Sequence, residues 1–159
     1  MVWGNPTFVL LAVLVVLLLS AAVEDARSRQ IANGKNAAIA LLAPLWWWAQ
    51  GLQLWPDIAL QIAVALIVFA LFCFAFARGW MGGGDVKMIG AVALWCVDWG
   101  ALAWLLILMS LIGGVLTLVL VIDQWRRRST APIEVPYGVA IAVAAAATLS
   151  EPILNQFHR

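Results

Sequence analysis

The sequence predicts an all-α, polytopic membrane protein with about six transmembrane helices. Hydrophobic residues make up 65% of its 159 residues, charged residues make up 11%, and the mean hydropathy is +1.02. A soluble domain carries about 25% charged residues, so the surface of this chain cannot face water throughout. Two further observations, the spacing of the apolar runs and the distribution of the basic residues, predict how the helices cross the membrane.

Six apolar runs, bounded by charged residues or by Gly and Pro, are the predicted spans. A membrane helix needs about 20 apolar residues, or somewhat fewer where the bilayer is thin. The second run is broken by Pro44 and the fourth is short, so we expect their ends to lie within the headgroup layer or below it. Together the runs predict a single transmembrane domain over residues 1–159. The runs cover residues 5–23, 37–51, 57–77, 86–97, 100–122 and 135–150.

The first run has to be distinguished from a secretory signal peptide. No charged residue precedes Glu24, whereas Arg27, Arg29 and Lys35 follow the run. A cleaved signal has the opposite order, with its basic residues before the apolar segment. We therefore expect a retained helix whose N-terminus lies outside the cytoplasm.

The basic residues support this orientation. It makes residues 24–36, 78–86 and 123–134 the cytoplasmic connections. Eight of the nine basic residues lie in these connections or at their edges, and the ninth, Arg159, lies outside, which is a strong positive-inside bias. The eight are Arg27, Arg29, Lys35, Arg78, Lys87, Arg126, Arg127 and Arg128.

Tryptophans gather instead at the predicted outer connections. Trp46, Trp47 and Trp48 are consecutive, and we expect them to form an outer aromatic belt. An indole at the membrane interface can bury its ring while its N–H reaches water.

Two aspartates are predicted to lie at the same membrane edge. Asp25 follows the first run and Asp85 opens the fourth. An odd-numbered helix enters the cytoplasm and an even-numbered helix leaves it, so both residues lie at the cytoplasmic edge. The same argument places Asp57, Asp98 and Glu151 on the opposite side of the bilayer.

Three glycines stand immediately before Asp85, in the stretch GGGD. An aspartate in the first turn of a helix accepts hydrogen bonds from backbone N–H groups and is favoured electrostatically there. The glycines permit a positive φ and a close approach of another chain. Irregular backbone at membrane depth is tolerated only where protein or a water-filled cavity covers it. The stretch therefore predicts a water-accessible notch for a polypeptide, although glycine before a capping aspartate is also an ordinary turn.

A pair of carboxyl groups can hydrolyse a peptide bond. Like charges at close range cannot both ionise, so one group acts as a base toward water while the other, protonated, polarises a carbonyl. Glu24 is an alternative to Asp25 as the first acid. Other chemistries are poorly supported, because the single histidine, His158, is near the end of the chain on the predicted outer side. Cys73 and Cys96 lie in apolar runs, so we expect both to be small buried side chains and not ligands of a zinc site or partners in a disulfide.

Three stretches together resemble the type IV prepilin peptidases, which are GxGD membrane aspartyl proteases. GGGDVK at 82–87 matches the GxGD motif and the lysine that follows it. DARSRQIAN at 25–33 resembles the segment led by the first catalytic aspartate, with Ala32 where the family has proline. VPYGVAIA at 135–142 resembles the start of the last catalytic-domain helix.

The resemblance implies an architecture and a set of site residues. It makes residues 1–159 a single transmembrane prepilin peptidase catalytic domain with the GxGD aspartyl protease architecture. The catalytic residues would be Asp25 and Asp85, with no cofactor and no metal. The residues implied to support the site or contact substrate are Gly82, Gly84, Lys87, Arg29, Asn33, Pro136, Tyr137 and Gly138.

The roles of several of these residues stay open at this point. Lys87 could hold the charge of Asp85, meet an acidic substrate residue, or serve only as a positive-inside anchor. Arg29 could contact substrate or anionic lipid headgroups. The hydroxyl of Tyr137 could donate a hydrogen bond in the site or mark the membrane interface.

The resemblance also implies a reaction and a location. The protein would cleave the leader peptide of a prepilin on the cytoplasmic side, after a glycine and before the hydrophobic helix of the pilin. The sequence lacks the paired CxxC motifs of longer prepilin peptidases, which suggests the short, protease-only type associated with Flp (tight-adherence) pili. Expected partners are the prepilin, the lipid bilayer of the bacterial cytoplasmic membrane and pilus-assembly proteins, with no nucleic acid.

Two functions of other classes compete with this one. Asp25 and Asp85 could relay protons in a transporter, although they lie at one membrane edge and the chain has no evident repeat. The protein could also be a non-enzymatic scaffold for pilus assembly, its helices packing through Gly113–Gly114 and the alanine-rich last span. Substitution of either aspartate by asparagine separates these classes, since only a protease would lose cleavage of a prepilin.

Overall fold

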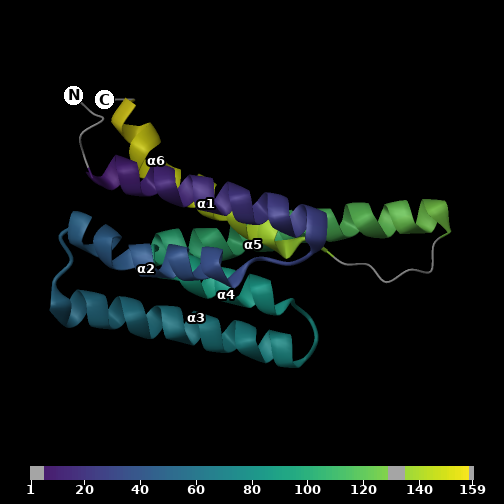
Figure 1. The fold of residues 1–159 in the computed structure, drawn as a ribbon, viewed down its shortest axis with the longest axis horizontal. Helices are drawn as coiled ribbons and strands as arrows, with labels where there is room; N and C mark the ends of the chain where they lie inside the picture. The colour runs from purple at the N-terminus through teal and green to yellow at the C-terminus, as the bar shows by residue number, and fades with distance from the viewer. Residues whose placement is uncertain (1–5, 129–134, 158–159) are drawn as a thin grey trace.

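The computed structural model describes residues 6–128 and 135–157 (Figure 1). His158, Arg159 and residues 129–134 of the third predicted cytoplasmic connection lie outside the described residues. Within the described ranges the chain is helical and contains no strand, so the all-α class is confirmed. The elements are α1 (Pro6–Ser28), α2 (Asn33–Ala49), the π-helical turn η2 (Leu54–Ile58), α3 (Ala59–Ala77), α4 (Gly83–Ala93), α5 (Trp99–Arg127) and α6 (Tyr137–Phe157).

The short helix α4 is largely buried and packs against three other helices. It contacts α2, α3 and α6, while α1 packs on α2 and α6, and α5 packs on α6. Figure 1 shows α4 between α2 and α3, with α1 and α6 running side by side. Most of α4 is buried, namely Asp85, Val86, Met88, Ile89, Ala91, Val92 and Ala93. The first turn of α4, which carries Asp85, is therefore fixed by neighbours on several sides.

Among the residues that the structure describes, three segments are long and apolar enough to cross a membrane, and they are Pro6–Ser28, Leu54–Ala77 and Trp99–Arg127. The helix α6 adds a shorter apolar stretch, Tyr137–Ser150. Large apolar side chains such as Leu66 on α3 are exposed on the outside of the bundle, as expected for a protein surrounded by lipid. These features identify a membrane protein.

The helix ends differ from the predicted runs. The first run was expected to end at residue 23, but α1 continues to Ser28, so Asp25 lies in its last turn. The fifth run was expected to end at residue 122, but α5 continues to Arg127, where two arginines occupy the last turn. Charged residues end an apolar run without ending a helix, and cations near a helix C-terminus are favoured by the helix dipole.

The short runs also differ from expectation. The second begins at Asn33, not at residue 37, and passes through Pro44 without a break. A proline inside a membrane helix is tolerated where its surroundings satisfy the freed backbone group. The fourth run, predicted at 86–97, is helical only over Gly83–Ala93. The sixth, predicted at 135–150, is helical over Tyr137–Phe157.

The expectation of an aromatic belt is wrong for two of its three tryptophans. Trp46 and Trp47 are buried, and Trp48 alone is exposed. The indole N–H of Trp46 donates to the carbonyl of Trp95 at 3.0 Å, and that of Trp47 donates to the carbonyl of Leu94 at 2.7 Å. Because α4 ends inside the bundle, its last carbonyls cannot reach water and need donors from neighbouring side chains.

A buried amide completes this arrangement. The side-chain nitrogen of Gln61 on α3 donates to the carbonyls of Ala93 and Cys96, at 2.8 and 2.9 Å. The indole of Trp95 donates in turn to the carbonyl of Ile39 on α2. Both cysteines are free, and Cys96 is buried as expected, whereas Cys73 is partly exposed.

Candidate active site

Asp25 is a buried carboxylate held between two helices. Its side chain is 4% exposed, although the residue lies in the last turn of α1. The backbone N–H of Gly138, in the first turn of α6, donates to Asp25 Oδ2 at 2.8 Å. Because the first N–H groups of a helix have no partner within it, they are free to bind an anion. The packing of α1 on α6 therefore gives Asp25 a defined position.

Asp85 lies in the first turn of α4 and is 8% exposed. Gly82 precedes the helix in an extended conformation, with φ −72° and ψ 145°. A Cβ atom on Gly82 would lie 3.0 Å from Asp85 Oδ2, so the carboxyl group lies against the glycine backbone. The other carboxyl oxygen, Oδ1, is buried and has no hydrogen-bond partner among the described residues.

The glycines before Asp85 serve close approach and not a left-handed backbone. Positive φ in glycine occurs at Gly51 and Gly79 in the described chain, and at none of the three glycines of the GGGD stretch. Of the two properties that the glycines permit, this stretch therefore uses the close approach and not the positive φ. A Cβ on Gly84 would lie 3.4 Å from the Cβ of Ile31, so the loop between α1 and α2 packs closely on the start of α4.

The two aspartates open into one cavity although they are far apart in the sequence. The cavity has a volume of about 490 Å³. The two carboxyl groups interact electrostatically, and the N–H of Gly138 lies near both. Two carboxyl groups that share a cavity and repel one another when both are charged favour a shared proton, which is the arrangement that hydrolysis by two acids needs. The lining residues are Asp25, Ser28, Arg29, Gln30, Gly79, Trp80, Met81, Gly82, Asp85, Val135 and Tyr137.

Glu24 has surroundings of a different kind. Its carboxylate accepts a hydrogen bond from the backbone N–H of Ala32 at 3.0 Å and pairs with the ammonium of Lys35 at 3.0 Å. These contacts connect the end of α1 to the start of α2. Glu24 does not line the cavity that Asp25 and Asp85 share.

The expected supporting residues fall into two groups. Arg29 and Tyr137 line the cavity, as does Gly82. Arg29 follows the end of α1 with a positive φ of 55°, and its charge acts on Asp25. The ring of Tyr137 packs on Gly113 of α5, where a Cβ would lie 2.6 Å from Tyr137 Cε1.

The remaining expected residues hold the helices around the cavity. Lys87 Nζ donates to Asn33 Oδ1 at 2.8 Å, which joins α4 to α2 at a different cavity. The side-chain nitrogen of Asn36 donates to the carbonyl of Gly84 at 3.2 Å, in the turn that carries Asp85. The carbonyl of Pro136 accepts from the N–H of Val139 and starts α6.

Sequence reasoning missed Trp80 and Met81, which form an apolar side of the cavity. The ring of Trp80 is 68% exposed, yet it contacts Phe74 edge-on with ring centroids 6.4 Å apart. The guanidinium of Arg78 lies 4.6 Å from the Phe74 ring centroid and 5.8 Å from that of Trp80. The sequence feature that could have pointed to Trp80 is its position between the cationic Arg78 and the glycine stretch that precedes Asp85.

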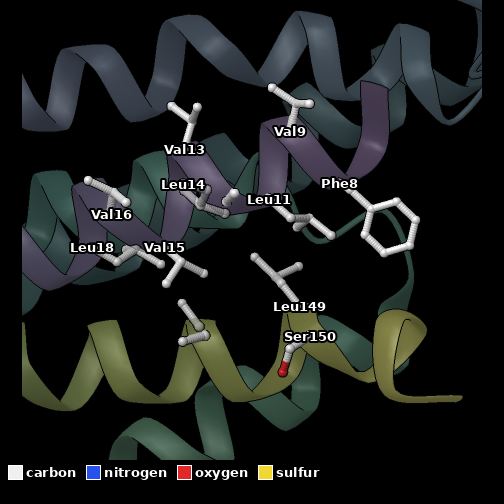
Figure 2. A pocket seen from close by; sticks show the side chains of 13 residues that line it. Phe8, Val9, Leu11, Val13, Leu14, Val15, Val16, Leu18, Leu149 and Ser150 are labelled. Atoms are coloured by element: carbon white, nitrogen blue, oxygen red, sulfur yellow. The ribbon is translucent and has the colours of Figure 1, made fainter. Parts of the chain in front are cut away.

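The largest cavity among those of the described residues offers no further candidate site for hydrolysis. A larger cavity, of about 630 Å³, lies between α1 and α6 (Figure 2). Its lining is hydrocarbon except for Ser150, so it offers no acid or base for hydrolysis. Within the part of the chain that the structure describes, no group of three or more His, Cys, Asp or Glu residues could hold a metal ion.

Comparison with known proteins supports the view that the cavity of Asp25 and Asp85 belongs to a protease. No curated protein and no solved structure matches the chain. The model of the type IV leader peptidase family matches residues 12–118, which is more than half of the chain and includes both aspartates of the cavity. The chain belongs to the type IV leader peptidase family.

Proposed function

We propose that the protein is an aspartic endopeptidase in which Asp25 and Asp85 together activate water. The observation that carries the proposal is the meeting of these two buried carboxyl groups in one cavity of about 490 Å³. They are electrostatically coupled, and a backbone N–H from a third helix lies near both. Membership of a peptidase family favours this reaction over proton transport or a scaffold role.

In the proposed reaction one carboxylate takes a proton from water, and the water oxygen attacks the carbon of the scissile carbonyl. The other carboxyl group, protonated beforehand, donates its proton to the carbonyl oxygen. A hydroxyl group of the tetrahedral intermediate then gives its proton to the ionised carboxylate as the carbonyl re-forms. The C–N bond breaks, and the leaving amine takes a proton from the other carboxyl group, so the site again holds one carboxylate and one carboxyl group. Such positioned acid–base transfer contributes about 10²–10⁴-fold to a rate.

The proposed substrate is a prepilin of the Flp type, cleaved where its leader meets its hydrophobic helix. The cavity has a polar side with Ser28, Arg29 and Gln30 and an apolar side with Trp80 and Met81. A cavity with both polar and apolar lining residues suits a polypeptide whose sequence changes from polar to apolar at the scissile bond. Pilus-assembly proteins are proposed as further partners, within the same membrane.

We further propose that residues 1–159 act as a single catalytic domain in the bacterial cytoplasmic membrane. The cavity would open at the cytoplasmic face, and both termini would lie outside. The distribution of basic residues supports this orientation.

The test is cleavage of a co-expressed candidate prepilin by asparagine variants. Asp25→Asn and Asp85→Asn each keep the shape of the side chain but remove one titrating group. Each should lower cleavage by roughly a thousandfold or more, and the double variant should be no worse, since groups that act as a unit are non-additive. The measurement is the ratio of unprocessed to mature pilin in membranes, with the level of each variant checked by blot.

Glu24→Gln is the matched control, because it makes the same kind of change one residue away. It weakens the contact with Lys35 but leaves the cavity intact, so substantial cleavage should remain. Near-normal processing by either aspartate variant would contradict the two-aspartate mechanism. An inactive Glu24→Gln together with an active Asp25→Asn would move the first acid by one residue.

A further inference from the structure

A second cavity, of about 450 Å³, lies on the other side of α4 from the aspartates. We refer to it as the α2–α3 groove. The helices α2 and α3 each pack on α4 but make little contact with one another, so the groove runs between them with α4 as its floor. Gly90 and Ala91 form the middle of its floor, and the ring of Phe69 packs on Gly90, where a Cβ would lie 2.7 Å from Phe69 Cδ2. The lining residues are Asn33, Asn36, Ala37, Ala40, Ile62, Ala65, Leu66, Phe69, Lys87, Gly90, Ala91 and Leu94.

The groove is polar at one end and apolar along its length. Asn33 and Lys87 lie at the start of α2 and α4, and their side chains are joined at 2.8 Å. Lys87 is exposed and makes no ion pair with any residue that the structure describes. An ammonium group has three donors, so two remain for an anion after the bond to Asn33.

A buried acceptor lies next to this cationic end. Asn36 lines the groove and is 4% exposed, and its nitrogen donates to the carbonyl of Gly84. Its Oδ1 is buried and has no hydrogen-bond partner in the described part of the chain. Leaving a buried acceptor unpaired is costly, and a hydroxyl donor at this end of the groove would satisfy it.

The dimensions of the groove decide which molecule fits. From Lys87 to Leu94, α4 rises by about 10 Å, so the cavity has a mean cross-section of about 45 Å² over this length. A helix about 10 Å across needs roughly 80 Å². The groove is therefore wide enough for an extended hydrocarbon chain, while a pilin helix is wider than this space.

We propose that the α2–α3 groove binds one phospholipid of the phosphatidylglycerol class. Its acyl chain lies between Ala40 of α2 and Leu66 of α3. Its phosphate accepts hydrogen bonds from Lys87, and a headgroup hydroxyl donates to Asn36. The net negative charge of this lipid complements the unpaired ammonium of Lys87. A zwitterionic lipid such as phosphatidylcholine has no net charge, and its headgroup has no hydrogen-bond donor for Asn36. The bound lipid fills the space that α2 and α3 leave open and so supports the start of α4, which carries Asp85.

The test is lipid retention, and it requires no peptidase activity. The purified full chain in detergent is mixed with equal amounts of phosphatidylglycerol and phosphatidylcholine of identical acyl chains, and bound lipid is measured by native mass spectrometry. The parent chain should retain one phosphatidylglycerol, with a preference of about tenfold for a charge-assisted contact. Lys87→Met should abolish the preference, and Ala40→Phe, which fills the groove, should lower retention of both lipids.

Lys35→Met is the matched control, because the Lys35 ammonium already pairs with Glu24 and donates to the carbonyl of Ser20. It should leave the preference unchanged. Thermal unfolding of each variant identifies any that fail to fold, and Lys87→Met, which adds no bulk, keeps the test decisive if Ala40→Phe does not fold. An unchanged preference in Lys87→Met overturns the proposal. So does displacement of the bound lipid by an uncleaved prepilin, which would assign the groove to the substrate.

Discussion

Gly138 is the residue on which the position of Asp25 depends most directly. Its N–H binds the Asp25 carboxylate, and the space where a Cβ would lie is already occupied. A Cβ there would be 2.7 Å from Ile31 Cδ1 and 2.9 Å from Asp25 Oδ2. Real Cβ contacts are not this short, so any side chain at this position has to push the carboxylate away.

Gly138→Ala should therefore reduce cleavage by roughly a hundredfold, the cost of displacing a reacting group by about an ångström. The change adds only one methyl group, at a helix start where alanine is tolerated. The measurement is the rate of prepilin cleavage by purified enzyme, with membrane insertion confirmed.

Gly114→Ala provides the control for this variant. Gly114 lies in α5 with nothing within 4 Å of its Cβ position. Cleavage should be unchanged, and the helix should gain up to about 1 kcal/mol from the lower entropy cost of alanine. Equal activity of Gly138→Ala and Gly114→Ala would show that the site does not depend on the position set by Gly138.

At the scale of one helix position, the pattern of apolar runs could not separate Glu24 from Asp25, and only the resemblance of the segment DARSRQIAN favoured Asp25. Neighbouring residues on a helix point about 100° apart, so one faces the start of α2 and the other faces α6. Both residues are acidic and both follow the same apolar run. Their positions in the sequence do not tell which of them faces α6 and which faces the start of α2. Only the packing of α1 against α6 and α2 decides it.

At the scale of elements, α4 is a helix that ends inside the protein. Its last carbonyls accept from Trp46, Trp47 and Gln61. These donors come from α2 and α3, so the end of α4 and the packing of its neighbours depend on one another. Trp46 and Trp47 therefore act as hydrogen-bond donors at the end of α4 and not as the interface anchors that their sequence predicts.

Trp47→Phe tests this account of the helix end. It keeps an aromatic ring but removes the N–H that lies 2.7 Å from the carbonyl of Leu94. A buried carbonyl left without a donor costs about 1–3 kcal/mol, so the unfolding temperature in detergent should fall by several degrees. Trp48→Phe, one residue on and 74% exposed, should shift it much less. Equal shifts in the two variants would contradict the assigned role of the Trp47 indole.

Comparison of the predicted apolar runs with the observed helices shows which features of the elements can be predicted from the sequence. Apolar runs predicted the existence and order of the helices, because hydropathy reports the surrounding solvent directly. Helix ends were less predictable, since Arg126 and Arg127 continue α5 while the apolar residues after Ala93 do not continue α4. Partners such as Trp47 and Leu94 are far apart in the sequence, and no local pattern connects them.

At the scale of the whole molecule, two cavities that are each lined by two aspartates lie in different parts of the fold. Asp25 and Asp85 share one, while Asp57 and Asp98 line another, beside the connection from α2 to α3. The parity of the apolar runs predicted this separation, although it gave no side-chain contacts. Trp80 could not be assigned from the sequence, because its place in the cavity depends on how the loop after α3 folds back toward α1.

The orientation proposed for the whole molecule rests on its charge distribution and can be measured independently of catalysis. Eight of nine basic residues lie in or beside the predicted cytoplasmic connections, and such residues are retained on the cytoplasmic side during insertion. Reporter fusions after residues 30, 82 and 128 should therefore report the cytoplasm. Fusions near residue 55 and at the C-terminus should report the outside. A C-terminus inside the cytoplasm would contradict six spans, and a fusion after residue 82 that reports the outside would place Asp85 on the wrong side for a cytoplasmic prepilin leader.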